Sequence, residues 1–578
     1  MENALTSHLA PLQKDRELRC KDLMLSPLSQ ISQRIWNPPT IMPVTADLEQ
    51  PSSLLLLAGA TAGVVCLIGL EEVLRLRNKA ANASSSSVDG KPGGRPDVLR
   101  HVTPEEKAKL CEVPRVKLTP MEAFDALRSG KDPHLQEKWR DELDSDVFYV
   151  QLPLNKRMYF CTDTSCWDTL LGPDGLEKSH VHRLLDLFGE GQMTRTRSLL
   201  SRKTSGEGWH AIRKALAPAF SNKTLVAKTH IYHRVLGSFV KALEDAADKG
   251  TIVNMPEWGL RYTIDMIGEV AYNYKFHAFD DERNGEAKAL LRGLDVIFRE
   301  TRYYSTHFVC VCVCRPYMVW KDQVREYYQS IRLFRDVCRK IYRQYLDTPP
   351  EKQDAASIIS YIHNNPGYQC EFEKLCDIYT LLWAGHDTTG YTISWAVYHL
   401  SSNPPVLKKL QQELDAAKFA EELPSYDELA QLPYFNACVK EIMRISPVVS
   451  NGTRRQTESG FKVTSRGVDY WIPGGYQMFV PLFARLRDDR IWGDGKVFRP
   501  ERWLEASEEQ LKVYNKLFQP FSIAPRSCIA QHLALIEVRM TIAALFKRYE
   551  FEITTEPEFF YSITYKPRGL MVKPIKRS

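Results

Sequence analysis

A long stretch from Glu371 to Leu400 constrains the fold more than any other segment of the chain. Its apolar residues are spread around the whole helical circumference, which is typical of a helix that crosses the core rather than covering a surface. Helical periodicity also dominates Leu199 to Leu346, as in Thr263 to Tyr272 and Asp322 to Tyr345. The sequence therefore predicts a mainly α fold organised around one buried helix.

A small β portion accompanies these helices. Asp146 to Leu152, a polar turn and Met158 to Cys161 predict a two-stranded hairpin. A helix from Tyr426 to Ile445 is followed by short strands near Phe461–Val463 and Val468–Ile472. The predicted fold class is mainly α with a small β portion.

Composition, net charge and cysteine spacing limit the classes of protein to which the chain can belong. The chain of 578 residues is 44% hydrophobic, which is enough for a large core. Its net charge of +6 does not demand nucleic acid and suits an anionic membrane surface or an acidic partner. Thirteen irregularly spaced cysteines argue against a disulfide framework and favour a reducing, cytosol-facing environment.

Ser52 to Leu70 runs nineteen residues without a charge, long enough to span a membrane as a helix. Cationic Arg75, Arg77 and Lys79 follow it, so the positive-inside rule puts the C-terminal side in the cytosol. A buried core helix or a cleaved signal peptide are the alternatives. The long preceding segment and the acidic residues that directly follow the stretch favour a single anchor.

This anchor divides the chain into four parts. We expect a poorly ordered N-terminal extension over 1–51, a transmembrane anchor over 52–70 and a linker rich in Ser, Gly and Pro over 71–103. Residues 104–578 then form the catalytic domain.

Cys528 lies near the end of the loop Pro520–Ala530, which directly precedes an amphipathic helix that begins at Gln531. The free N–H groups and the dipole of a helix start favour a thiolate, which is a good metal ligand. No CxxC partner stands nearby, so a zinc site or a redox dithiol is disfavoured. A cysteine at such a position can equally be inert or merely reactive.

The buried helix carries an acid and a hydroxyl side by side, Asp387 and Thr388, within Ala384–Thr389. The Thr388 hydroxyl can bond the carbonyl of Ala384 one turn back and locally open the helix ladder. The pair is a candidate proton relay. The alternative is a kinked core helix whose Asp387 is paired elsewhere.

Two further groups combine charge with helical spacing. Glu441 and Arg444 lie one turn apart, and Arg502 offers a third partner; such a set is either a buried structural network or an ordinary surface pair. Trp209 and Arg213 share one helix face and can both donate to one carboxylate, or the Trp is simply buried beneath a long Arg. The alternating run Val309–Cys314 receives no function.

These pieces, in this order, resemble the cytochrome P450 family of haem-thiolate monooxygenases, from about Asp144 to the C-terminus. The anchor, linker and catalytic domain are similar to its microsomal, membrane-anchored branch, and the resemblance implies the cytochrome P450 fold preceded by one transmembrane helix. It implies these roles: metal ligand, Cys528; other haem contacts, Trp209, Arg213, Arg454, Phe521 and Arg526; acid–alcohol pair, Asp387 and Thr388; structural network, Glu441, Arg444 and Arg502.

The resemblance further implies insertion of one oxygen atom from O₂ into a lipophilic substrate, with haem b as cofactor. Electrons come from a separate NADPH-dependent flavoprotein reductase. A fatty-acid-like substrate is favoured, with a sterol or terpenoid also open, and no nucleic acid is involved. The expected location is the endoplasmic reticulum membrane, single-pass with a cytosolic catalytic domain, or another organelle membrane. The alternatives are a haem-thiolate isomerase or dehydratase, and a non-catalytic haem-binding protein.

The family's layout also suggests a pocket lined by Leu381, Leu382, Ala384 and Val448–Thr453. The cysteine loop departs from the family by having Ala524 and Ala530 where glycine is usual; a positive φ at an alanine would cost about 1 kcal/mol. The run Leu486 to Asp489 likewise lacks the His-Arg-Asp-Pro order that is common in relatives.

Overall fold

The computed structural model describes residues 104–153, 155–173, 175–179, 197–205, 208–306, 322–421, 423–456 and 460–577. The predicted extension 1–51, anchor 52–70 and linker 71–103 lie outside these ranges, as does the cysteine-containing run Val309–Cys314, and all remain predictions. Within the described ranges, no helix combines the length and the apolar character needed to cross a membrane.

The described part of the chain is mainly helical with small sheets, as predicted. The helices of eight or more residues are α5 (Pro120–Arg128), α6 (Asp132–Leu143), α9 (Trp209–Leu216), α11 (Thr229–Asp248), α12 (Met255–Tyr272), α13 (Gly285–Thr306), α15 (Asp322–Asp347), α17 (Glu371–Ser401), α18 (Pro404–Ala416), α20 (Pro433–Ile445), α24 (Glu508–Leu517) and α25 (Gln531–Arg548). The shorter helices are α4 (Pro104–Ala108), η2 (Thr164–Cys166), α7 (Trp167–Leu171), η4 (Ala217–Phe220), α10 (Asn222–Val226), η6 (Pro350–Lys352), α16 (Ile358–His363), α19 (Tyr426–Ala430), α21 (Phe483–Leu486), α22 (Asp489–Trp492) and α23 (Arg502–Glu505).

Four small sheets contain the described strands. These are β1 (Val147–Gln151), β2 (Arg157–Cys161), β3 (Glu177–Lys178), β4 (Val253–Asn254), β5 (Thr453–Gln456), β6 (Phe461–Ser465), β7 (Val468–Ile472), β8 (Gln477–Val480), β9 (Tyr549–Thr555), β10 (Glu558–Tyr561), β11 (Tyr565–Arg568) and β12 (Met571–Lys576). The largest sheet has the order β1-β2-β8-β5-β3, and the others are β4-β12-β9, β6-β7 and β10-β11. The predicted hairpin is confirmed as the antiparallel pair β1–β2, and the two short strands as β6–β7.

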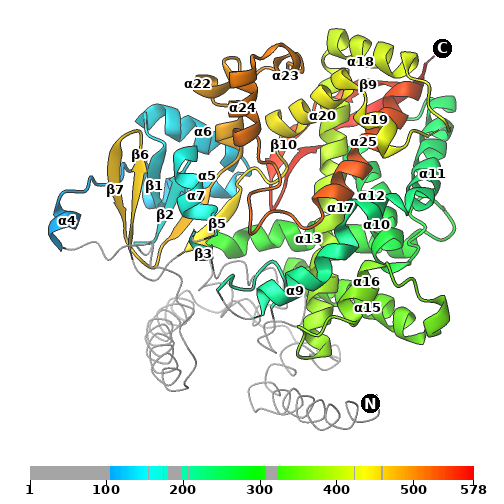
Figure 1. Cartoon of the computed structure of the whole chain (residues 1–578), viewed down its shortest axis with the longest axis horizontal. Coiled ribbons are helices and arrows are strands. Elements are labelled where there is room, and N and C mark those ends of the chain that lie inside the picture. Colours follow the sequence, from blue (N-terminus) through cyan, green and yellow to red (C-terminus); the bar gives the residue numbers. More distant parts are fainter. Residues whose placement is uncertain are drawn as a thin grey trace, which may run out of the picture.

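Helix α17 crosses the core, as its composition predicts. In Figure 1 the strands β1, β2 and β5–β7 lie to one side of α17, and α11, α12 and α25 lie to the other. Helices α12 and α17 approach closely at a pair of glycines, because a Cβ on Gly259 would lie 2.8 Å from the carbonyl oxygen of Gly390. The Thr263 hydroxyl also donates to the carbonyl of His386 over 2.8 Å. These contacts fix α17 against α12.

The largest sheet brings two basic residues together. Strands β3 and β5 are antiparallel neighbours in which Lys178 lies opposite Arg455, and Lys178 and Arg454 line the same cavity. Gly452 directly precedes β5 with φ of 60°, and a Cβ there would lie 1.8 Å from the carbonyl oxygen of Val480. Only glycine fits at this point, which fixes where β5 begins.

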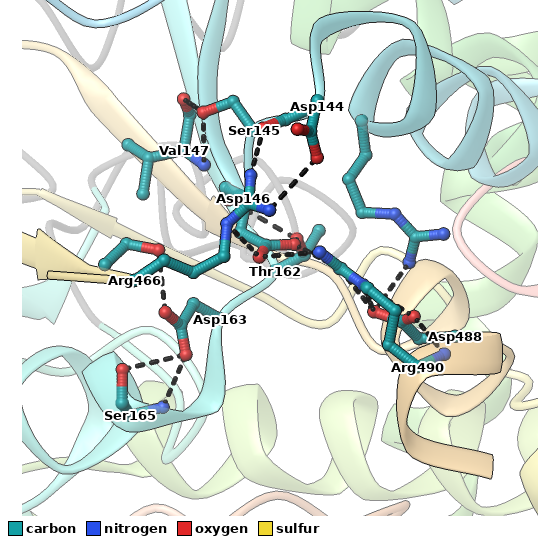
Figure 2. Close-up of polar contacts among 12 residues, drawn as sticks. Asp144, Ser145, Asp146, Val147, Thr162, Asp163, Ser165, Arg466, Asp488 and Arg490 are labelled. Atoms are coloured by element: carbon teal, nitrogen blue, oxygen red, sulfur yellow. Dashed lines mark hydrogen bonds and ion pairs between the residues drawn. The ribbon is translucent and has the colours of Figure 1, made fainter. Parts of the chain in front are cut away.

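An ionic cluster fastens the edge of this sheet to its surroundings (Figure 2). Asp146, just before β1, lies between two arginines: Nη2 of Arg490 is 2.7 Å from its Oδ1, and Nε of Arg466 is 3.3 Å from its Oδ2. Arg466 belongs to the β6–β7 turn, and Arg490 also binds Asp488. The cluster therefore joins β1, the β6–β7 hairpin and α22.

Glu441, Arg444 and Arg502 form a buried network in which all three side chains are 0% exposed. Arg444 makes a two-pronged contact with Glu441, with Nε to Oε2 at 2.8 Å and Nη2 to Oε1 at 2.7 Å. Nε of Arg502 and the indole of Trp503 each donate to the same carboxylate over 2.9 Å. Of the two interpretations that the sequence left open, the surface pair is therefore wrong.

One predicted helix differs from the observed structure. The single helix expected over Tyr426–Ile445 is two helices, α19 and α20, because α20 begins at Pro433. Proline has no N–H to continue a preceding helix, whereas it fits the first turn of a new one.

The network gives a stability prediction. Glu441→Gln removes the acid that both fully buried guanidinium groups share, so we expect the free energy of unfolding to fall by about 3–5 kcal/mol. The matched control is Glu142→Gln, which breaks an exposed one-turn pair with Lys138 and is expected to change stability by less than about 1 kcal/mol. Urea unfolding of both variants measures the difference; equal effects would contradict the role of the network.

Candidate active site

The predicted haem contacts meet at one cavity of about 430 Å³. Its walls come from α17, α9, the cysteine loop, the segment from α20 into β5, and the turn between β10 and β11. All six predicted cofactor residues line it: Trp209, Arg213, Arg454, Phe521, Arg526 and Cys528. The volume is within the range of about 300–1,000 Å³ that is typical of ligand sites.

The loop before α25 holds Cys528 at the cavity. The Cys528 N–H donates to the carbonyl of Phe521 over 2.9 Å, which closes the loop. In this loop the residue with positive φ is Ser522, at 63°, whereas Ala530 has φ of −95° and Ala524 is not among the residues with positive φ. The strain considered for Ala524 is therefore absent, because its backbone does not adopt the conformation that favours glycine.

The Cys528 side chain is exposed to the cavity that it lines. Burial within the protein raises the pKa of the Cys528 thiol, while the N–H of Ala530 and the charge of Arg213 act in the opposite direction. The expectation that a helix start makes the free thiol acidic is thus not met, since burial outweighs both. An opposing positive charge at the sulfur, such as a metal ion, is what would favour the thiolate.

Cationic side chains gather at the same cavity. Arg213, Arg454 and Arg526 are joined there by Lys178, which sequence reasoning missed. Nζ of Lys178 donates to the Thr453 hydroxyl over 3.2 Å. Burial lowers the pKa of Lys178 well below its usual value, and the neighbouring arginine charges lower it further.

Four cations lining a largely apolar cavity are costly unless an anion neutralises them. Haem b brings two carboxylates and an iron that accepts a thiolate ligand, so the residues present fit this cofactor. No sequence signal marks Lys178, because it reaches the cavity only through the pairing of β3 with β5.

Trp209 lies between two of these arginines, with guanidinium carbons of Arg526 and Arg213 at 4.1 and 5.5 Å from ring centroids of its indole. We expected Trp209 and Arg213 to donate to one carboxylate. In this structure the indole donates to the carbonyl of Leu199 over 3.0 Å, and Arg213 donates to the carbonyl of Ser527 over 2.7 Å. The two donors are thus on adjacent sides of the cavity but satisfy different backbone groups.

Leu199 connects Trp209 and Arg526 to α17. Its carbonyl accepts from both Trp209 and Arg526, and its N–H donates to Oδ1 of Asp377 over 2.5 Å. Asp377 is fully buried and also accepts from the Tyr368 hydroxyl over 2.6 Å. Burial raises the pKa of Asp377 to about 6, although these hydrogen bonds act in the opposite direction. Sequence reasoning missed Asp377; an acid inside an otherwise apolar helix was the signal that could have found it.

The acid–alcohol pair is split between two environments. Thr388 lines the cavity and its hydroxyl donates to the carbonyl of Ala384 over 2.9 Å, as predicted, yet α17 continues unbroken. Asp387 is buried outside the cavity wall and accepts from the Thr564 hydroxyl over 2.6 Å. Burial raises the pKa of Asp387, while the charges of His386 and Lys566 oppose the shift.

The remaining wall is mostly apolar. Leu381, Ala384, Val448 and Val449 line it as expected, whereas Leu382 is fully buried elsewhere and does not. The segment that follows Val449 also lines the wall, except at Ser450, which is fully buried.

Comparison with known proteins gives a family match. The family model described as cytochrome P450 matches residues 153–575. Cytochrome P450 3A31 of Mesocricetus auratus is 27% identical over 378 residues, which cover 64% of this chain and 73% of that protein. Cytochrome P450 3A14 of Cavia porcellus is 26% identical, covering 60% and 68%. Protein LUTEIN DEFICIENT 5, chloroplastic, of Arabidopsis thaliana is 26% identical, covering 60% and 58%.

Asp377 gives a pH prediction. Its pKa of about 6 in the folded protein exceeds the value of about 3.9 for an unperturbed Asp, so the folded state binds more protons between these values. This group's stabilising contribution is therefore complete near pH 4 and is lost as the pH rises through 6, with a slope of up to about 1.4 kcal/mol per pH unit.

Asp377→Asn should remove this group's contribution to the pH dependence of the unfolding free energy. Urea unfolding from pH 4 to 8 should show a stability difference between wild type and variant that changes mainly between pH 4 and 6. Asp245→Asn, at an exposed position of α11, controls for the loss of one carboxylate. A pH-independent difference would contradict the assignment.

Proposed function

Because the chain belongs to the cytochrome P450 family of monooxygenases, we propose that it inserts one oxygen atom from O₂ into a lipophilic substrate, using electrons from NADPH through a separate flavoprotein reductase. One observation carries the proposal: the Cys528 sulfur, the cations and the Thr388 hydroxyl all face one cavity. A thiol ligand, counter-charges and a polar group at the reacting side are the parts that this chemistry needs.

We assign a separate role to each group of residues. Cys528 supplies the sulfur ligand to iron, and Trp209, Arg213, Arg454 and Arg526 hold the cofactor carboxylates. Haem b with a thiolate ligand supplies the activation of O₂ when bound. The wall excludes water from the reacting side.

Proton supply falls to the acid–alcohol pair. Thr388 presents a hydroxyl at the cavity wall. Asp387 lies behind the wall, and burial raises its pKa, which favours the protonated form that a proton donor needs.

The substrate is lipophilic, because the wall near Thr388 is formed by Leu381, Ala384, Val448 and Val449. Among lipophilic classes we favour a fatty-acid-like substrate, since the sequence of Ala384–Thr389 is similar to fatty-acid-hydroxylating branches of the family. A sterol or terpenoid would be distinguished by substrate-induced spectral shifts.

We also propose that residues 52–70 anchor the protein in the endoplasmic reticulum membrane with residues 104–578 in the cytosol. The support is the uncharged stretch and the cations that follow it. One relative is named as chloroplastic, so cell fractionation must include other organelles. Protection of the catalytic domain from protease added to intact microsomes would contradict this orientation.

The sulfur ligand is tested by substitution. Cys528→Ser should abolish the red-shifted absorption band of the reduced, carbon-monoxide-bound protein, since that band depends on thiolate ligation. Cys111→Ser, at an exposed cysteine, should leave it unchanged. Retention of the band by the Cys528 variant would overturn the assignment, and product formation without NADPH and O₂ would favour an isomerase.

The role of Thr388 is tested by coupling. Thr388→Ala removes the hydroxyl at the cavity wall, so we expect O₂ and NADPH consumption to continue while product per NADPH falls by about a hundredfold, the lower end of the range for proton transfer. Ser394→Ala is the matched control, because Ser394 makes the same one-turn bond to a carbonyl of α17, that of Gly390, but does not line the cavity. Full coupling in the Thr388 variant would exclude the role.

A further inference from the structure

Asp387 needs a connection to the cavity that it does not reach itself. Thr564 supplies one: it lies in the turn between β10 and β11, is 2% exposed, and lines the cavity wall. Its hydroxyl donates to Oδ2 of Asp387 over 2.6 Å. The Thr388 hydroxyl, by contrast, is bonded to the carbonyl of Ala384. Thr564 is therefore the group in direct contact with both the acid and the cavity.

A buried lysine acts on the acid through its charge. Lys566 follows Thr564 by two residues and belongs to β11. Its side chain is only 7% exposed, and its Nζ is 3.3 Å from the hydroxyl of Tyr391 and 3.4 Å from Oδ1 of Asp295. Tyr391 is one turn after Asp387 on α17.

Asp295 brings this set to the solvent. It belongs to α13, and its side chain is 60% exposed. Its second oxygen is 4.0 Å from Nη1 of Arg299 on the same helix. Asp295, Lys566 and Tyr391 are thus joined by direct contacts, as are Asp387 and Thr564, and the two sets interact through the charge of Lys566.

We propose that Thr564 carries protons between Asp387 and the cavity, and that the charge of Lys566 determines how readily Asp387 releases its proton. This inference rests on the proposed oxygenase function and deepens it. Thr388 remains the hydroxyl of the cavity wall, whereas Lys566 is a positioning residue that acts on the acid through its charge.

The proton balance closes in two steps. Thr564 gives its hydroxyl proton to the cavity and takes the proton of Asp387. The Asp387 carboxylate then takes a proton from solvent, so one proton enters for each one delivered and no redox partner is consumed. Lys566 keeps its own proton throughout.

The electrostatics of the set agree with these roles. The charged groups that act on Asp387 are His386, Lys566 and Asp295; burial raises the pKa of Asp387 and the first two charges oppose it. For Lys566, burial lowers the pKa but is outweighed by Tyr391, Asp387 and Asp295, so the ammonium form is retained. Burial raises the pKa of Tyr391 to about 12, so its phenol stays protonated.

The first test measures the protonation of Asp387 directly and does not require catalytic turnover. In infrared titrations the band of a protonated carboxyl that is missing from Asp387→Asn reports this side chain. Lys566→Met removes the charge that opposes the raised pKa, so the band should persist to a pH at least about one unit higher, a tenfold change in proton affinity. Lys566→Arg should restore the wild-type midpoint, whereas Lys576→Met, at a surface ion pair on β12, should not move it. An unmoved midpoint in Lys566→Met overturns the role of Lys566.

The second test measures proton delivery to the cavity. Thr564→Val should slow product formation about a hundredfold, the lower end of the range for proton transfer, and raise its solvent deuterium isotope effect, while Thr564→Ser restores both. Thr554→Val, at an exposed threonine of β9, is the control. An unchanged isotope effect overturns the role of Thr564. Because the infrared midpoint is measured without substrate, it decides the role of Lys566 even if the protein proves to have another reaction.

Discussion

A helix that crosses the core must find partners inside the protein for its polar side chains, and α17 does so for most of them, although the hydroxyls of Tyr379 and Ser401 have no hydrogen-bond partner among the described residues. Some of its hydroxyls bond carbonyls one turn back, as Thr388 and Ser394 do. Its two fully buried acids cannot use that solution, since a carboxylate is an acceptor and needs donors from elsewhere. Asp377 therefore binds Leu199 and Tyr368, and Asp387 binds Thr564.

These two pairings organise opposite sides of one cavity. Through Leu199, Asp377 is joined to the indole of Trp209 and the guanidinium of Arg526, which belong to the basic side. Through Thr564, Asp387 is joined to the wall beside Thr388. The same requirement of satisfying buried polar groups thus fixes both the basic side of the cavity and the side beside Thr388.

The basic side of the cavity is held by structure that lies outside it. Lys178 and Arg454 come from adjacent strands of the largest sheet, whose edge is fastened by the ionic cluster around Asp146. The buried network of Glu441 ties α20 to the segment near Arg502, and α20 leads into the strand that carries Arg454. A cofactor with two carboxylates is thereby met by cations whose positions are set before it binds.

The sequence alone determined the elements whose signal is local. The apolar circumference of Glu371–Leu400, the two-residue alternation of the hairpin and the loop that ends in Cys528 depend on neighbouring residues, and each predicted the observed element or position. Even there, Pro433 divided a helix that periodicity had joined.

Only the tertiary structure decided which distant residues meet. Asp387 and Thr564 are 177 residues apart, and Lys178 reaches Thr453 across 275. Such pairings follow from how helices and strands pack and not from spacing along the chain, so no pattern in the sequence marks Thr564, Lys566 or Lys178. For the same reason the sequence located the acid at position 387, but the packing of β11 against α17 decided what it contacts.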